Sequence, residues 1–210
     1  MKDRITKRQI IIIISVLVVT VVAVIAVSRM LNGQNEGIDN KPEQDVKGES
    51  NVLVAYFSWS GNVQQIARWV AEETDGEIFR IVPQESYGKD YANCANRSKK
   101  ELNDRTRPKL SSHIDKDIMA KYDTICLGFP VWWYELPMPV WTFLEEYDLE
   151  GKTIIPFFSD GGTPDGGNTL ERLKELAPKS NVLSDDALEI RKGTAFNSEK
   201  KIRDWAKSFK

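Results

Sequence analysis

The sequence is poor in the residues that most often bind metals or form disulfide bonds. Among its 210 residues there is one histidine, His113, and there are two cysteines, Cys94 and Cys126. A single histidine excludes most histidine-rich metal sites and argues against a Ser-His-Asp triad. Cys126 lies in an apolar, strand-like run typical of a core residue, so we expect no disulfide bond. We therefore predict no metal centre and nominate no catalytic side chain.

Several nucleotide-binding and hydrolase patterns are also missing. Acidic residues outnumber basic ones, 31 to 29, and no basic cluster stands out, so we expect no nucleic-acid partner. No G-x-G-x-x-G follows a predicted strand, and no G-x-S-x-G is present, which disfavours a dinucleotide site and a hydrolase nucleophile. The run Gly151-Lys152-Thr153 is similar to the end of a P-loop, but Glu146 stands where the first glycine belongs.

One long apolar run is present, at residues 10–27, softened only by Ser15 and Thr20. A helix of this length spans about 27 Å, close to the roughly 30 Å of a bilayer core. We predict a basic cytoplasmic tail at 1–9 and a transmembrane anchor at 10–28. The basic residues precede the run, so the protein would be a single-pass cell-membrane protein with its domain outside the cytoplasm. The alternative is a cleaved signal peptide, because Ala26-Val27-Ser28 offers a cleavage site.

The remaining chain divides into a linker at 29–50 and one domain at 51–210. The linker is polar and shows no periodicity. In the domain, strands are expected at 52–57, 77–82, 122–128 and 153–158, with a weaker fifth strand within 181–190. Helices are expected from Val63 to Ala71, at 91–103, at 139–147, around Leu170 to Ala177, and at 198–209, where Asn197 is the expected cap. This alternation predicts an α/β fold with a doubly wound parallel sheet.

The first of three unusual loops follows the strand at 52–57. It reads Ser58-Trp59-Ser60-Gly61-Asn62 and leads into a helix. A helix start carries unpaired N–H groups and a partial positive charge, and the two serine hydroxyls add donors. We interpret this loop as a phosphate cradle. The alternative is a serine-capped helix that binds nothing.

Two further loops follow the third and fourth strands, so they are expected at the same edge of the sheet. One places Trp132, Trp133 and Tyr134 in a row. Adjacent aromatic residues cannot all face one core, so at least one should be exposed or covered by a ligand. The other holds four glycines within 159–167, which lets a flat ligand approach the backbone. Its aspartates, Asp160 and Asp165, more often shape a turn than bind a metal.

The chain from 51 to 209 resembles the flavodoxin-like flavoproteins. The likeness rests on Y-F-S-W-S-G-N-V at 56–63, Y-x-x-C-x-x-x-S-K-K-E-L at 91–102, R-P-K-L at 107–110, Y-D-T-I-C-L-G-F-P-V-W-W at 122–133 and G-K-T-I-I-P-F-F-S-D-G-G at 151–162. It implies a five-stranded sheet of order 2-1-3-4-5, preceded here by the predicted transmembrane helix, and FMN as cofactor.

The resemblance also implies which residues would bind FMN. Its phosphate would be held by Ser58, Ser60, Gly61, Asn62 and Val63. Its ring would lie against Pro130, Val131, Trp132, Trp133 and Tyr134 and against Ser159, Asp160, Gly161 and Gly162, with Trp59 as a further face. Two positions depart from the family pattern. Val63 replaces a usual threonine and removes a hydroxyl from the phosphate site, and Tyr134 replaces a frequent glycine near the reactive part of the flavin.

These observations predict a membrane-tethered, FMN-binding protein in extracytoplasmic electron transfer. Its partner would be a redox protein or a small quinone-like acceptor, and the acidic domain would suit a basic protein partner. Two alternatives stay open at this point. One is an FMN-dependent NAD(P)H:quinone or nitro-compound reductase. The other is a binding domain on the same fold that has lost its cofactor.

Overall fold

The strands of the sheet are the short apolar runs of the sequence, and the longest are buried on both faces. In the computed structural model, which describes residues 44–191 and 193–209, the strands are β1 Val52–Tyr56, β2 Glu77–Arg80, β3 Thr124–Pro130, β4 Thr153–Asp160, β5 Asn181–Val182 and β6 Leu188–Arg191. All five pairings between them are parallel. The order β2-β1-β3-β4-β5 confirms the predicted sheet.

The predicted fifth strand is two strands, so the sheet has six strands among the described residues. Both pair with β4: β5 at Thr153–Ile154, and β6 at Phe157–Asp160. The amide of Ser184 turns back onto the carbonyl of Val182, and a polar Ser-Asp-Asp stretch follows. Polar residues at this point cannot replace the apolar side chains of a buried strand, so the chain leaves the sheet before it re-enters as β6.

Strands β3 and β4 are longer at their carboxyl ends than expected. Pro130 closes β3, and Ser159 and Asp160 close β4, although all three were expected in loops. Backbone pairing explains the difference, because Pro130 stands opposite Ser159 in the β3–β4 register. Pro130 offers a carbonyl but no N–H, and the strand end is a position where this is tolerated.

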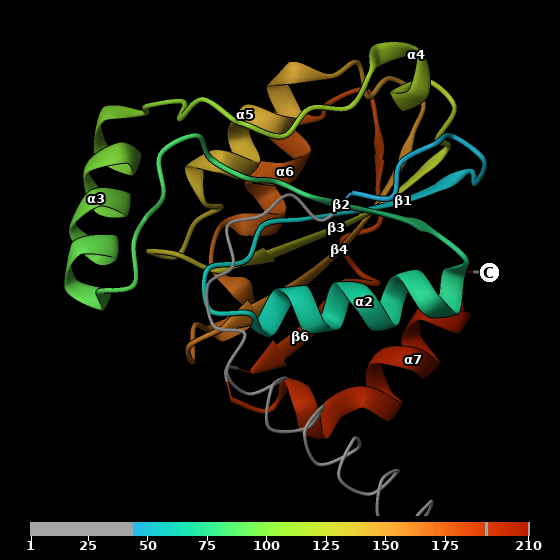
Figure 1. Cartoon of the computed structure of the whole chain (residues 1–210). Coiled ribbons are helices and arrows are strands. Elements are labelled where there is room, and N and C mark those ends of the chain that lie inside the picture. Colours follow the sequence, from blue (N-terminus) through green and yellow to red (C-terminus); the bar gives the residue numbers. More distant parts are fainter. Residues whose placement is uncertain (1–43, 192, 210) are drawn as a thin grey trace, which may run out of the picture. The chain divides into compact units, whose positions relative to one another are not determined.

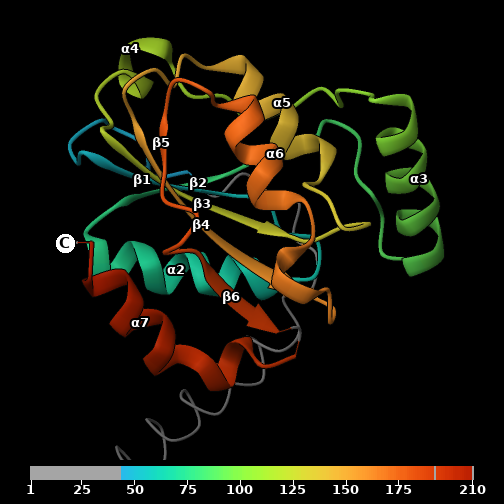
Figure 2. The same cartoon turned by 180° about the vertical axis from the view of Figure 1, so that it is seen from behind.

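Helices cover both faces of the sheet, as the alternation of elements predicts (Figure 1, Figure 2). They are α2 Asn62–Thr74, α3 Tyr91–Asp104, α4 Lys116–Met119, α5 Met138–Glu146, α6 Thr169–Leu176 and α7 Glu199–Lys207. Helices α2 and α7 lie on one face and α5 and α6 on the other. Helix α7 follows a 3₁₀ turn and begins after Ser198, which makes no side-chain cap, so the prediction that Asn197 caps it is wrong.

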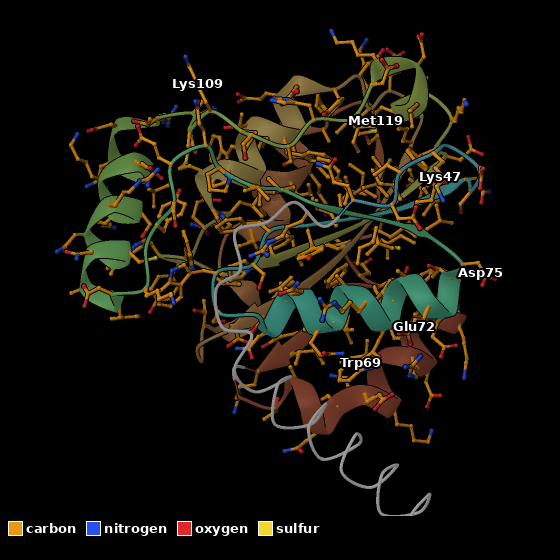
Figure 3. All side chains as sticks on the ribbon, in the orientation of Figure 1. Lys47, Trp69, Glu72, Asp75, Lys109 and Met119 are labelled. Carbon is orange, nitrogen blue, oxygen red and sulfur yellow. The ribbon has the colours of Figure 1, made fainter. Side chains whose placement is uncertain are left out.

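Helices α2 and α7 contact each other through apolar side chains and through a cluster of ion pairs. Trp69 is buried, and Figure 3 shows it with Glu72 on the side of α2 that faces α7. The guanidinium of Arg203 on α7 lies 2.7 Å from a Glu72 oxygen and 2.8 Å from a Glu73 oxygen. Such a network fixes the position of α7 better than one exposed pair, which contributes little.

The two cysteines and Lys152 have structural roles. Cys94 and Cys126 are buried free thiols, which confirms the expected absence of a disulfide bond. Lys152 of the P-loop-like run is buried, and its ammonium donates to the backbone oxygen of Tyr122 at 2.5 Å. It therefore secures the start of β3 and is not free to bind a phosphate.

The segment Gln44–Ser50, which the sequence places in the linker, binds β2. Gln44 pairs with Phe79 in an antiparallel bridge, and the amide of Asp45 donates to Ile78. The amides of Lys47, Gly48, Glu49 and Ser50 all donate to the carboxylate of Glu77. The hydroxyl of Tyr122 adds a bond of 2.7 Å to the same carboxylate. We call this arrangement the Glu77 clasp.

The predicted anchor at 10–28 lies outside the described residues. Within 44–191 and 193–209, no helix has both the length and the apolar character needed to cross a membrane. The transmembrane segment therefore stays a sequence prediction.

Replacing Glu77 with glutamine should remove a pH-dependent part of the stability. Burial opposes ionisation of Glu77, but hydrogen bonds from Ser50, Tyr122, Lys47 and Gly48 outweigh it and lower its pKa to about 2. This contribution is therefore present above the unfolded pKa of about 4.3 and is lost as pH falls toward 2. We expect Glu77→Gln to lower the free energy of unfolding at pH 7 by about 1–3 kcal/mol.

The measurement is urea unfolding of both proteins from about pH 7 to about pH 2.5. This range runs from above the unfolded pKa of Glu77 down toward its folded pKa. The two stabilities should converge as the pH falls. A difference that stays constant across this range would contradict the clasp as the cause.

Candidate functional site

The register of the central strands brings the three loops to one edge of the sheet. Tyr56, the last residue of β1, pairs with Gly128, and Gly128 pairs with Phe157, so β3 and β4 end at the same edge as β1, two and three residues beyond this row. Backbone bonds continue beyond this row: the amide of Phe57 donates to Gly128 and that of Val131 to Ser159, both at 2.9 Å. The predicted meeting of the loops at the carboxyl edge is thus seen in the backbone.

The first loop leaves the start of α2 without a side-chain cap. Gly61 occupies the cap position with a φ of 86°, a left-handed conformation that glycine adopts without strain. The hydroxyl of Ser58 is used locally, since it accepts from the amide of Gly61 at 3.1 Å. Ser60 is exposed and Asn62 is half-buried. The first turn of α2 contains no acidic residue, so its N–H groups suit an external anion.

Two predicted residues of this loop have a structural role. The side chain of Val63 is 1% exposed and packs in the core between α2 and the sheet. It does not face the loop surface, so its backbone N–H is the part that an anion can reach. Trp59 is half-buried, and its ring N–H donates to the carbonyl of Gly88 at 2.8 Å, which ties the first loop to the segment before α3.

The second loop is a tight turn in an unfavourable conformation. Trp132 and Glu135 exchange two backbone hydrogen bonds, of 3.1 and 3.0 Å, around Trp133 and Tyr134. Trp133 has a φ of 57° and Tyr134 a φ of 63°, which side chains other than glycine rarely adopt. Glycine, which the resemblance implies at position 134, would adopt this backbone conformation without strain. A strained turn persists only where its surroundings hold it in place.

The aromatic residues of the second loop divide as expected. Trp132 packs edge-on against Phe57 and Tyr87, with ring centroids 5.2 and 5.1 Å apart. Trp133 and Tyr134 are 44% and 61% exposed. They supply the exposed aromatic surface that the sequence predicts at this edge.

The third loop combines a buried carboxylate with open backbone. Ser159 and Asp160 are buried, and one oxygen of Asp160 accepts from the amide of Gly162 at 2.5 Å. Gly161 and Gly162 are exposed, and no atom lies within 4 Å of where a Cβ would stand. A flat molecule can therefore approach their backbone closely.

The second and third loops touch each other through Gly167. The amide of Asn168 donates to the carbonyl of Tyr134 at 2.8 Å. A Cβ at Gly167 would lie 2.7 Å from that same carbonyl oxygen. The absence of a side chain at Gly167 thus permits the contact that supports the strained turn.

Helix α3 adds a wall that sequence reasoning did not place at the site. Strand β3 points toward α3 in both cartoon views (Figure 1, Figure 2). A cavity of about 160 Å³ lies between this helix and the first two loops. Its lining consists of Trp59, Tyr91, Cys94, Ala95, Ser98, Val131, Trp132 and Trp133. The four residues from α3 are spaced as one helix face, a signal that was readable in the sequence.

Helix α3 is held in place by polar contacts to the chain before it. Asp90 caps its start by accepting from Asn93 at 2.8 Å. The buried carboxylate of Glu101 accepts from the hydroxyl of Tyr87 and, at 2.7 Å, from Arg97. The ring N–H of Trp133 donates to Ser98 at 3.0 Å. The helix and the second loop are therefore connected directly.

A carboxyl pair lies at the base of the third loop. In the β4–β6 register, Phe158 pairs with Glu189 and Asp160 with Arg191, so these four side chains share one face of the sheet. Asp160 is 2% exposed, and its Oδ2 is the one buried side-chain oxygen or nitrogen among the described residues without a hydrogen-bond partner. Burial first, and then Asp160, raises the pKa of Glu189. A proton on Glu189 would supply the missing donor.

Comparison with known proteins assigns the chain to a family. A model described as "Flavodoxin" matches residues 51–208. The chain belongs to the flavodoxin family. No curated protein matches it.

Two solved structures are similar over nearly their whole length. A putative flavoprotein from Bacteroides uniformis ATCC 8492 is 34% identical, with a TM-score of 0.64 and coverage of 74% of this chain and 97% of that one. A putative flavoprotein from Bacteroides eggerthii DSM 20697 is 32% identical, with a TM-score of 0.61 and coverage of 73% and 94%. Both support the assignment to the flavodoxin family.

A third similar structure shares the fold at lower identity. It is a flavoprotein from Lactobacillus acidophilus NCFM, described as a complex with FMN. It is 22% identical, with a TM-score of 0.54 and coverage of 71% of this chain and 97% of that one. At this identity the likeness shows the flavodoxin fold alone.

Replacing Gly167 with alanine should separate the second and third loops of this flavodoxin-family chain. Its φ of 65° is unfavourable for alanine, and the new Cβ would meet the Tyr134 carbonyl. We expect a loss of about 2 kcal/mol in the free energy of unfolding, measured in urea. Gly161→Ala is the matched control, since nothing lies near its Cβ and its φ is outside the left-handed region. Equal stability of the two variants would contradict the proposed contact.

Replacing Glu189 with glutamine should stabilise the fold at neutral pH. Because the folded pKa of Glu189 is raised, its contribution is present below the unfolded value of about 4.3 and is lost as pH rises through the folded pKa. A glutamine amide offers Asp160 a donor at every pH. We expect the Tm of Glu189→Gln to exceed that of the natural chain at pH 7 and the difference to shrink near pH 4. A lower Tm of the variant at pH 7 would refute the pairing.

Proposed function

We propose that the chain binds FMN at the carboxyl edge of the sheet and acts in electron transfer. The observation that carries this proposal is the first loop, where an uncapped helix start and an exposed serine face outward. The N–H groups of a helix start that no side chain caps suit a phosphate group. Family membership supports the proposal, as does the FMN complex of the Lactobacillus flavoprotein with the same fold.

The other two loops fit the ring of a flavin. Trp133 and Tyr134 offer exposed aromatic surface, and Gly161 and Gly162 offer backbone without side-chain cover. When bound, FMN supplies one- or two-electron chemistry, and the chain's residues bind and orient it. Ser60, Asn62 and the first amides of α2 would hold the phosphate, while the second and third loops would hold the ring.

The proposed location of the protein rests on its N-terminal sequence. The apolar run at 10–27, preceded by basic residues, supports a membrane-tethered protein with its domain outside the cytoplasm. In this proposal, electrons pass between FMN and a partner protein or a small acceptor at the membrane.

A second candidate is a reductase that uses NAD(P)H directly on a quinone or nitro compound. The cavity between α3 and the second loop favours it, because aromatic side chains line a space open to a small flat molecule. Turnover of a quinone with NAD(P)H, without any partner protein, would distinguish this reductase from an electron carrier.

The first test is an absorption titration of the purified chain with FMN. We expect the visible flavin bands to shift on binding. The variant Ser60→Ala plus Asn62→Ala should bind FMN at least about tenfold more weakly, since it lacks two side-chain hydrogen bonds to a charged group.

Asn181→Ala plus Ser184→Ala is the matched control, because Asn181 begins β5 and Ser184 follows it, and β5 pairs with the opposite end of β4. This variant should bind FMN as the natural chain does. A natural chain that leaves the FMN spectrum unchanged would refute the redox proposal and favour a cofactor-free binding domain.

A further inference from the structure

Arg80, the last residue of β2, is a buried cation without a counter-ion among the residues that the structure describes. Its side chain is 4% exposed. Within 44–191 and 193–209, no carboxylate forms an ion pair with it, and its one hydrogen bond runs from Nη2 to the carbonyl of Ser58, at 3.4 Å. Arginine stays charged in proteins, so this burial cannot be relieved by loss of a proton.

The position of Arg80 relates it to the first loop. Arg80 pairs with Tyr56 in the parallel β1–β2 register, so both side chains lie on the same face of the sheet. Tyr56 belongs to the core beneath α2. The guanidinium therefore lies on the α2 side, at the carboxyl edge, and reaches the loop that opens this helix.

An anion near the first loop would stabilise the buried charge of Arg80. A buried charge without compensation is strongly unfavourable, and Arg80 donates only one long hydrogen bond, to a neutral carbonyl. The first turn of α2 has the same electrostatic sign, with uncapped N–H groups and no acidic residue. Two positive features next to one loop repel each other unless a negative group lies between or beside them.

We propose that Arg80 is the charge partner of the phosphate bound at the first loop. The inference rests on the proposed FMN site and adds to it a residue outside the loop that sequence reasoning assigned. Arg80 reads as an ordinary polar residue at the end of the apolar run E-I-F-R-I-V, and only the folded structure shows that it is buried beside the loop. The site then distinguishes a phosphorylated flavin from its dephosphorylated form by charge.

The test compares FMN with riboflavin, which carries the same ring without the phosphate. Affinities are measured by flavin fluorescence for the natural full-length chain, Arg80→Met and Arg80→Lys. We expect Arg80→Met to bind FMN about ten- to a hundredfold more weakly, the range for hydrogen bonds to charged groups. Its riboflavin affinity should change by less than about twofold. Arg80→Lys keeps the charge and should retain a preference for FMN over riboflavin.

Arg105→Met is the matched control, since it removes the same charge from an exposed residue at the end of α3. It should leave both affinities unchanged. An FMN affinity of Arg80→Met equal to that of the natural chain would overturn the role of Arg80 and leave the FMN site intact. If the natural chain binds neither flavin, the proposed function itself fails.

A second measurement uses the natural chain alone and so does not depend on the folding of Arg80→Met. The Nε–H resonance of Arg80 is followed by NMR during addition of inorganic phosphate. We expect this resonance to shift and that of Arg105 to stay in place. A shift on addition of phosphate, together with an FMN affinity of Arg80→Met equal to that of the natural chain, would overturn the role of Arg80 toward FMN and identify a site for inorganic phosphate instead. An unchanged Arg80 resonance would refute the proposal.

Discussion

The site depends on the parallel pairing of β3 with β1 and β4. This pairing is close because Gly128, in the middle strand, has no side chain: a Cβ there would lie 2.3 Å from the ring of Phe157. With the three strands in register, all three end at the same edge of the sheet, and the loops that follow them start there. The cradle, the aromatic turn and the open glycines therefore come from distant parts of the sequence but share one edge.

Local patterns were sufficient for the elements and the order of the sheet, because buried strands and amphipathic helices leave apolar periodicities that do not depend on tertiary context. The residues that the sequence did not reveal owe their roles to long-range packing. Arg80 is polar in sequence but buried in the fold, and the α3 face becomes a wall only because Glu101 and Ser98 connect it to other loops. The division of the fifth strand likewise reflects pairing with β4, which no local propensity encodes.

The two departures from the family pattern differ in their consequences. Val63 lies in the core, so its side chain does not face the loop surface, and it gives α2 an apolar anchor. Tyr134 changes the backbone energetics, since its φ of 63° is one that glycine adopts freely. The turn keeps this conformation through the backbone bonds between Trp132 and Glu135 and through Asn168, so the neighbouring loop compensates for the strain.

The direction of the segment Gln44–Ser50 has a mechanical consequence. It runs antiparallel to β2, so Gln44 lies nearest the carboxyl edge of the sheet. The Glu77 clasp lies at the other end, where β2 begins. Tension applied through the preceding chain would load the bonds of Gln44 and Asp45 before it reached the clasp. Gln44 and Asp45 would detach from β2 first. The Glu77 clasp would then resist the force and protect the sheet from tension applied through the preceding chain.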